Sequence, residues 1–181
     1  MTRKHGPWTI KERVEKYSNE LIEVREDQVI QPDGKPGTYA TVKIKEGISV
    51  LALDADGFVH LVKEFRYALG SESIETVSGA IDEGESFEAA ARRELREELG
   101  IEAKQLTSLG RFDPSTSMID SPAHLFLARD LSFKEQQTEA TETIKPVKMK
   151  LEQAVRMVLQ SEITAGVSCV LILRADYYLK S

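Results

Sequence analysis

The chain has 181 residues, of which 41% are hydrophobic and 30% charged, with a formal net charge of −6. This length suits one domain with its own core, and an acidic chain without a basic block argues against a general nucleic-acid surface. It contains neither an apolar signal region nor a bilayer-spanning stretch. The single cysteine, Cys169, cannot form an internal disulfide, so we expect a reducing, cytoplasmic setting.

The first 40 residues predict an extended arm. Residues 7–31 alternate in part between apolar and polar side chains, which is typical of strands. The segment QPDGKPG at 31–37 is dense in turn-forming residues. We expect residues 1–40 to form an N-terminal β arm and residues 41–181 to form the main domain.

The main domain is predicted to alternate strands with helices. Strands are expected at 38–45, 47–54, 58–66, 72–78, 105–113 and 122–129, and helices at 86–99, 150–160 and 163–178. This order predicts an α+β or α/β sandwich in which a mixed sheet lies between helices.

The helix expected at 86–99 has clear ends and one apolar side. Ser86 suits the N-cap, and Gly100 suits the left-handed residue that ends a helix. With successive residues about 100° apart, the apolar side chains form a single arc that must face the protein. The arc consists of Phe87, Ala90, Ala91, Leu95 and Leu99.

Acidic side chains fall on this inward face. Glu94 and Glu98 lie inside the apolar arc and Glu97 lies at its edge, whereas Arg92 and Arg96 point the other way. Like charges at positions i and i+4 repel even in water, and they cost more when they are turned toward protein. Such carboxylates suit a hard cation such as Mg²⁺ or Mn²⁺. The alternative is a solvated helix with Arg–Glu pairs, and periodicity alone leaves both open.

The spacing of residues around this helix matches a known motif. Gly79 is followed after five residues by Glu85, and after seven more by RELREELGI at 93–101. This pattern resembles the Nudix box, G-x5-E-x7-R-E-U-x-E-E-x-G-U with U a bulky aliphatic residue, at every specified position. The chain is therefore identified as a member of the Nudix hydrolase family, and weaker likeness extends from about Trp8 to Ala154.

The resemblance implies the Nudix fold, an α+β fold with a mixed sheet between helices. It also implies metal-dependent hydrolysis of a nucleoside diphosphate linked to another group. Glu94 and Glu98 would bind the metal, with Glu97 as a further ligand or as the base for water. Arg93 would orient the glutamates, and the backbone carbonyl of Ser78 would be another ligand. Mg²⁺ is the expected cofactor, with Mn²⁺ able to substitute. The structural residues of the box would be Gly79, Glu85 and Gly100.

The rest of the chain resembles the ADP-ribose and nucleotide-sugar pyrophosphatase branch of the family. The likeness is carried by LVKEFRYALGSESIETVSGAIDEGE, by LGRFDPSTSMIDSPAHLFLARDL, and by the N-terminal arm, which in that branch pairs with the partner subunit. There are departures. IETVSG stands where the branch has WELPAG, and the loop after Pro114 lacks the usual glycine. The catalytic base therefore stays open among Glu97, Asp120 and the pair Glu139 and Glu142.

Residues outside the box are candidates for substrate binding. Arg66 would bind the diphosphate through two hydrogen bonds or else lie as a surface arginine. Glu75 would bind sugar hydroxyls or form a salt bridge, and Glu142 is a further substrate-binding candidate. Stacking on a base is possible for Trp8, Phe65 and Tyr67, although packing is the better interpretation for each. Structural roles are expected for His5, His60 and His124.

Taken together, these features predict an Mg²⁺-dependent pyrophosphatase of nucleoside diphosphate sugars such as ADP-ribose and GDP-mannose. The products would be a nucleoside monophosphate and a sugar phosphate. We expect a homodimer formed through the N-terminal arm, with no nucleic-acid or membrane partner. The alternatives are a strict ADP-ribose or dinucleoside polyphosphate hydrolase, and a nucleotide-sensing Nudix module without turnover. The complete box argues against the sensor, because such a site has no need of three inward carboxylates.

Overall fold

The computed structural model describes residues 2–134 and 144–181 and divides the chain into two compact units. The first unit runs to Lys45 and also includes Asp113–Ser121. The second unit consists of Glu46–Phe112 and Pro122–Ser181. Within the described ranges, no helix is long and apolar enough to cross a membrane.

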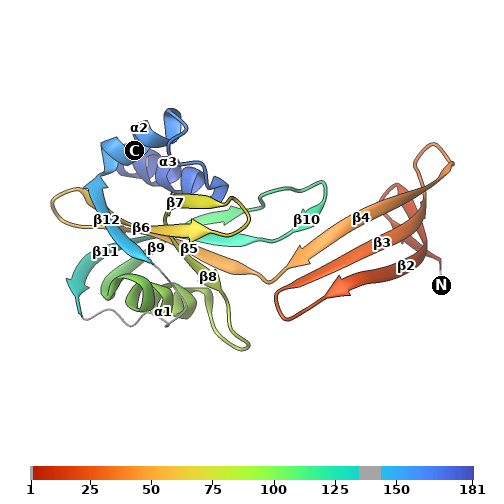
Figure 1. Ribbon diagram of the computed structural model, residues 1–181, viewed down its shortest axis with the longest axis horizontal. Helices are drawn as coiled ribbons and strands as arrows, with labels where there is room; N and C mark the ends of the chain where they lie inside the picture. Colours follow the sequence, from red (N-terminus) through yellow and green to blue (C-terminus); the bar gives the residue numbers. More distant parts are fainter. Residues whose placement is uncertain (1, 135–143) are drawn as a thin grey trace. The chain divides into compact units, whose positions relative to one another are not determined.

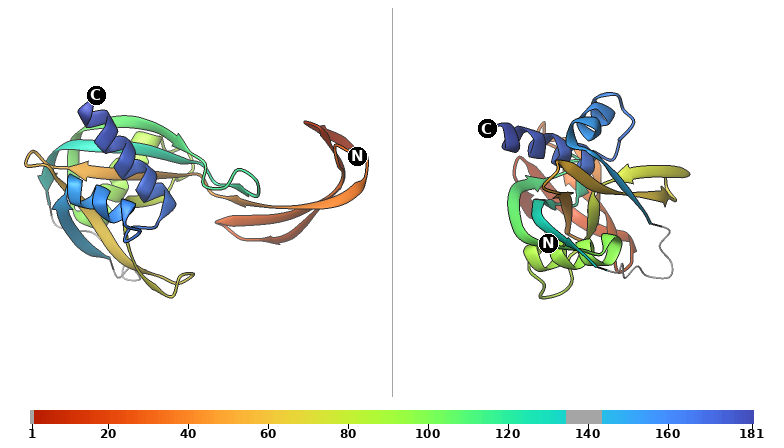
Figure 2. Two further views of the ribbon diagram at one scale, coloured as in Figure 1. Left: turned by 90° about the horizontal axis from the view of Figure 1, so that it is seen from above. Right: turned by 90° about the vertical axis from the view of Figure 1, so that its left-hand side faces the viewer.

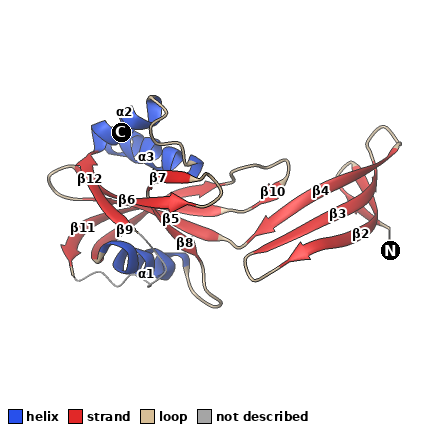
Figure 3. Ribbon diagram, viewed as in Figure 1, coloured by secondary structure: helices blue, strands red, loops and turns tan. Residues whose placement is uncertain are grey.

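The first unit is a five-stranded sheet in the order β1-β2-β3-β4-β10 (Figure 3). Its strands are β1 (Arg3–His5), β2 (Trp8–Ser18), β3 (Ile22–Ile30), β4 (Pro36–Ile44) and β10 (Ile119–Asp120). The first four pair antiparallel, and β10 joins β4 in parallel. Arg13 and Asp27 face each other across β2 and β3 and form a two-pronged ion pair with both distances 2.7 Å.

The second unit is built on a seven-stranded sheet, and this sheet is mixed, as the sequence predicts. Its strands are β5 (Gly47–Leu53), β6 (Phe58–Arg66), β7 (Ser71–Glu75), β8 (Val77–Ala80), β9 (Ile101–Phe112), β11 (Ala123–Phe133) and β12 (Lys145–Lys150). The main path is β12-β6-β5-β11-β9, with β7 paired to β6 and β8 paired to β5. The β5–β11 pair is parallel, whereas the other pairs are antiparallel.

Three helices cover the two faces of this sheet. They are α1 (Phe87–Leu99), α2 (Leu151–Leu159) and α3 (Gly166–Lys180). Figures 1 and 2 show α1 on one face and the α2–α3 pair on the other. The predicted sandwich of a mixed sheet between helices is therefore confirmed.

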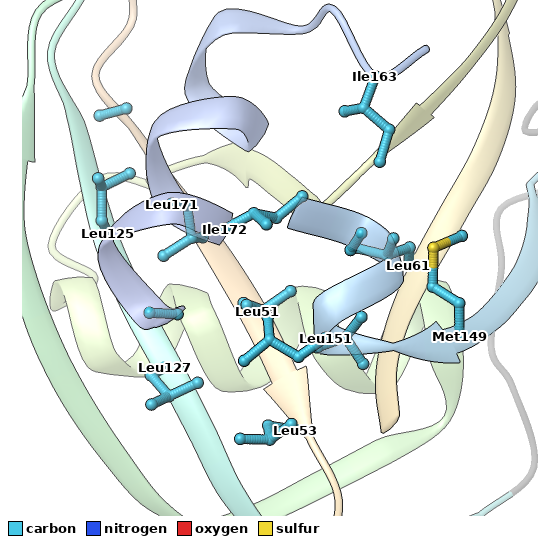
Figure 4. Packing of buried hydrophobic residues seen from close by; sticks show 14 residues of the cluster. Leu51, Leu53, Leu61, Leu125, Leu127, Met149, Leu151, Ile163, Leu171 and Ile172 are labelled. Atoms are coloured by element: carbon cyan, nitrogen blue, oxygen red, sulfur yellow. The ribbon is translucent and has the colours of Figure 1, made fainter. Parts of the chain in front are cut away.

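The period of the strands sorts the core into two layers. Along β5, Ile48, Val50 and Ala52 join the cluster that packs on α1. Leu51 and Leu53 point to the opposite face and join the cluster that packs on α2 and α3 (Figure 4). Alternate side chains of a strand point to opposite faces, so a strand buried on both sides is apolar at almost every position.

Some element bounds differ from those expected from the sequence. The strand expected at 72–78 is two strands, β7 and β8, interrupted at Thr76. The first of them pairs with β6 and the second with β5, and such a change of partner has no local sequence signal. Strand β12 was missed for a similar reason, because KPVKMK becomes a strand by pairing with β6. Helix α3 begins at Gly166, three residues later than expected.

Candidate active site

Helix α1 begins and ends where the local sequence predicts. The Ser86 hydroxyl accepts a hydrogen bond from the amide of Ala89 at 3.2 Å. Gly100 has φ 63° and ψ 27°, the left-handed conformation, and its amide donates to the Arg96 carbonyl at 3.0 Å. These caps satisfy backbone groups that would otherwise have no partner within the helix. They fix where α1 begins and ends, and the packing of Ala90, Ala91 and Leu95 in the core sets which side faces the sheet.

The acidic side chains of α1 do turn inward. Glu98 is only 7% exposed, and the side chains of Glu94 and Glu97 are 13% and 33% exposed. Arg92 and Arg96 are exposed on the outer side of the helix. The orientation predicted from the helical period is therefore confirmed, with a gradient of burial among the three glutamates.

One arginine joins several of these carboxylates. Arg93 donates from Nε and Nη2 to both oxygens of Glu85, each at 3.0 Å. Its Nη1 donates to Glu94 at 2.7 Å and to Glu97 at 3.1 Å. Its Nη2 also reaches the carbonyl of Ala80, at 3.0 Å, and so ties α1 to the end of β8. The pKa of Arg93 is raised, chiefly by the bond to Glu85 and further by Glu94 and Glu97, while burial acts in the opposite direction.

Gly79 makes room for one of the glutamates. A Cβ atom built on Gly79 would overlap the carboxylate of Glu94, so only glycine allows β8 and α1 to approach this closely. Gly79 pairs with Ile48 of β5, and Ser78 pairs with Ser49. The first glycine of the motif therefore leaves the space that the Glu94 carboxylate occupies.

The chemistry of this donor set suits a divalent cation. Glu85, Glu94 and Glu97 share a single guanidinium, so negative charge exceeds positive charge around Arg93. Carboxylate oxygens are the ligands that Mg²⁺ and Mn²⁺ prefer. Among the described residues, no group of three or more His, Cys, Asp or Glu side chains already surrounds a possible metal position. Glu94 and Glu97 are instead hydrogen-bonded to Arg93.

A second arginine cluster lies on β6 and β7. Arg66 donates to both oxygens of Glu75, at 3.1 and 2.8 Å, and lies 2.7 Å from Glu64. The pKa of Arg66 is raised mainly by its bond to Glu75, with smaller electrostatic contributions from Glu64 and then Glu98. Burial alone would raise the pKa of Glu75, but the bonds from Arg66 and Ser73 outweigh it and lower that pKa. The structure thus brings Arg66 and Glu75 together and sets them within electrostatic range of α1.

Glu64 was not identified from the sequence. It lies two residues before Arg66 on the same strand, so both side chains lie on one face of β6. That period-two relation was the available signal. It was not decisive, because charged residues two apart on a strand are common on surfaces.

Other predicted site residues are not part of these two clusters of described residues. Asp120 ends β10 in the first unit, whereas Glu139 and Glu142 fall outside the described residues. Tyr67 is 95% exposed in the turn after β6. Trp8 of the first unit stacks edge-on against Tyr39, with ring centroids 5.3 Å apart.

Two of the histidines have local partners. His60 shares a hydrogen bond of 3.1 Å with Asp54. His124 shares one of 2.7 Å with Glu46, and its ring stacks on Phe87 at the start of α1. The stacking on His124 gives Phe87, which belongs to the apolar arc, a packing partner although Phe87 is 37% exposed.

Comparisons with known proteins agree on one family. The model of the NUDIX domain matches residues 43–166. The chain is 34% identical over 149 residues to the ADP-ribose pyrophosphatase of Bacillus subtilis (strain 168), covering 81% of this chain and 80% of that protein. It is 26% identical over 149 residues to the methanol dehydrogenase activator of Bacillus methanolicus, with the same coverage of 81% and 80%.

A solved structure supports the fold. The crystal structure of an ADP compounds hydrolase superposes with a TM-score of 0.85, covering 98% of this chain and 97% of that one. The two sequences are 22% identical, so this match bears on the fold alone.

Proposed function

Because the chain belongs to the Nudix family and is a Nudix hydrolase, we propose that it hydrolyses the pyrophosphate bond of ADP-ribose and related nucleoside diphosphate sugars. Water would attack one phosphorus, and the bridging oxygen would leave with the other phosphate. ADP-ribose would give AMP and ribose 5-phosphate. The likeness to the Bacillus subtilis ADP-ribose pyrophosphatase supports this substrate class.

The observation that carries the proposal is the carboxylate cluster around Arg93 on α1. Glu94, Glu98 and Glu97, with the backbone carbonyl of Ser78, would hold Mg²⁺, and Mn²⁺ would substitute. The bound cation would neutralise charge on the diphosphate and lower the pKa of a water molecule. Arg93 would keep Glu94 and Glu97 oriented while the cation enters.

Proton removal from water is assigned to Glu97. Its side chain is 33% exposed, against 13% for Glu94, so of these two α1 residues Glu97 can pass a proton to solvent more directly. Asp120 and the pair Glu139 and Glu142 are the alternative bases. Replacing each of the four with the matching amide tests the assignment. The rates are compared at saturating metal, because Glu97 is also a proposed ligand, and only loss of the base should then lower kcat at high pH.

The diphosphate of the substrate would bind to Arg66. Its guanidinium is already oriented by Glu75 and Glu64, and the planar fork of arginine suits phosphate oxygens. Glu75 would then either hold Arg66 in place or accept hydrogen bonds from sugar hydroxyls. GDP-mannose is proposed as a second substrate, since nothing in the Arg93 cluster distinguishes the base or the sugar.

Residues 1–40 are proposed to pair two subunits, as the family resemblance implies. The sheet of the first unit supports this, because β1 pairs only with Trp8–Ile10 of β2. Among the described residues, the rest of β2 therefore offers a strand edge to a partner. Light scattering on the whole chain would give twice the mass of 20.3 kDa. A monomer mass would remove this part of the proposal.

The similarity to the methanol dehydrogenase activator favours one other function, a Nudix protein that acts on a second protein. A substrate panel separates the two. With Mg²⁺ present, ADP-ribose should be cleaved with a higher kcat/KM than GDP-mannose, a diadenosine polyphosphate or ATP. Products are identified by anion-exchange chromatography. Cleavage of ATP alone, or of no member of the panel, would overturn the proposal.

A further inference from the structure

A chain of buried hydroxyl groups lies under the strand that leads into the active-site loop. Ser49 and Thr76 are fully buried, and Ser168 is 2% exposed. Ser49 Oγ and Thr76 Oγ1 share a hydrogen bond of 2.7 Å, and Thr76 Oγ1 shares one of 3.0 Å with Ser168 Oγ. Ser78 donates to Ser49 Oγ at 3.0 Å. The chain therefore links α3 to β8 through β5.

The hydroxyls compensate for an interruption of the sheet. Thr76 lies between β7 and β8, where the strand changes partner, and its amide donates to Ser168 Oγ at 3.0 Å. A buried amide without a hydrogen-bond partner costs free energy of folding. The Ser168 hydroxyl of α3 accepts the hydrogen bond that a carbonyl of a neighbouring strand would otherwise accept. Hydrogen bonds linked in series in a buried setting also strengthen one another.

The same passage departs from the pattern of the pyrophosphatase branch. IETVSG puts Val77 where WELPAG has proline, and puts Thr76 and Ser78 where it has leucine and alanine. Proline restricts φ to about −65° and stiffens the backbone before the glycine. In this chain, hydrogen bonds from Thr76 and Ser78 supply that restraint instead.

The restraint acts on the active site through Gly79. The Ser78 side chain is hydrogen-bonded to Ser49. The next residue, Gly79, packs directly against the Glu94 carboxylate. A shift of the Ser78–Gly79 backbone would therefore move Glu94 away from its position on α1. It would also move the Ser78 carbonyl.

We propose that Ser49, Thr76 and Ser168 are positioning residues that hold the Ser78–Gly79 backbone against Glu94 and so set the metal affinity of the site. This inference rests on the proposed function, in which Glu94 and the Ser78 carbonyl are metal ligands. It assigns to α3, on the opposite face of the sheet from α1, a direct part in tuning the site.

The test measures the affinity of the whole chain for Mn²⁺. Binding is monitored as the loss of the electron paramagnetic resonance signal of free Mn²⁺. Thr76→Val keeps the shape of the side chain and removes the hydroxyl, and should weaken Mn²⁺ binding by about tenfold, as is typical for outer-shell partners of a metal site. Thr76→Ser restores the hydroxyl and should restore wild-type affinity. Thermal unfolding of each variant is measured in parallel.

A matched control separates positioning from general loss of stability. Ile163→Val removes one methylene from the core beneath α3, where Ile163 is 1% exposed, without touching a hydroxyl. It should lower the melting temperature and leave Mn²⁺ affinity unchanged. Equal weakening by Ile163→Val and Thr76→Val would overturn the proposal, as would unchanged affinity in Thr76→Val.

If Thr76→Val does not fold, Ser168→Ala tests the far end of the chain from α3, 92 positions away in sequence from Thr76. It should weaken Mn²⁺ binding in the same direction by a smaller factor, and unchanged affinity would contradict the proposal. Failure of the proposed function gives a different result. In that case the wild-type chain itself binds no Mn²⁺, and this result would also contradict the positioning role.

Discussion

Arg93 and Arg66 each form ion pairs with glutamates in the second unit, but the two clusters are assembled in different ways. Arg93 draws its hydrogen-bonded carboxylates from its own helix and the loop before it, between Glu85 and Glu97. Arg66 meets Glu75 across two strands, and that contact depends on the register of β6 with β7. The first cluster can be recognised from spacing along the chain, whereas the second exists only once the strands pair.

The two clusters also differ in what their geometry is suited to do. Around Arg93, three carboxylates share one guanidinium, so the cluster has negative charge to offer a cation. Around Arg66, Glu75 accepts hydrogen bonds from two guanidinium nitrogens and Glu64 lies 2.7 Å from the third, so these two carboxylates orient the guanidinium. We interpret the first as the metal side of the site and the second as the phosphate side.

The largest effect should come from neutralising Glu98, the most buried of the glutamates that we propose as metal ligands. Glu98→Gln keeps the shape of the side chain and removes its charge, so kcat should fall by about two to three orders of magnitude. Circular dichroism should be unchanged. Glu88→Gln, an exposed change at the start of the same helix, is the control. Near-normal turnover of ADP-ribose by Glu98→Gln would remove α1 from the mechanism.

A smaller but still large effect is expected beneath Glu94. Gly79→Ala places a methyl group where the Glu94 carboxylate rests, and misplacing a catalytic group by about 1 Å can cost about 100-fold in rate. Gly166→Ala is the matched control, because its added Cβ meets only Phe112, at 4.0 Å. Steady-state kinetics of both variants on ADP-ribose decide the matter, and equal activities would contradict the close fit.

The second cluster should respond through substrate binding. Arg66→Gln removes a charged hydrogen-bond donor, and kcat/KM for ADP-ribose should fall by about tenfold or more. The change should appear mainly in KM if Arg66 binds the diphosphate equally in ground and transition states. Arg96→Gln, on the exposed side of α1, should leave kcat/KM unchanged. A loss of the same size in both variants would indicate a general charge effect.

The smallest effect is a pH dependence of stability. The pKa of Glu75 is lowered in the folded chain, so the folded state favours its ionised form. Its stabilisation is therefore complete above the unfolded pKa, about 4.3, and is lost as pH falls through the lower folded value. Urea unfolding of wild type and Glu75→Gln should differ most above about pH 5 and converge in acid. A constant difference across this range would contradict the ion pair.

Features set by neighbouring residues could be predicted from the sequence, whereas features set by distant partners could not. Helix α1 and its surroundings show why. The helix caps and the helical period depend on residues close together in sequence. The cap residues Ser86 and Gly100 and the inward orientation of Glu98 were therefore predictable. The break at Thr76 and strand β12 depend on partners far away in sequence. Their own residues carry no signal of the pairing.

The first unit shows the same limit. Its β strands were expected from alternation, but the inclusion of Asp113–Ser121 was not. That segment joins through β10, a strand of only two residues that pairs in parallel with β4. Two residues are too few to show a period, so only the folded chain reveals that Asp120 belongs to this unit.

The most direct test of the account is the metal dependence of ADP-ribose cleavage by the wild-type chain. AMP release would be measured with Mg²⁺, after addition of a chelator, and again after Mg²⁺ is restored in excess. The account predicts turnover that stops with the chelator and returns with the metal. Continued release of AMP in the presence of the chelator would contradict a site in which the carboxylates of α1 work by holding a cation.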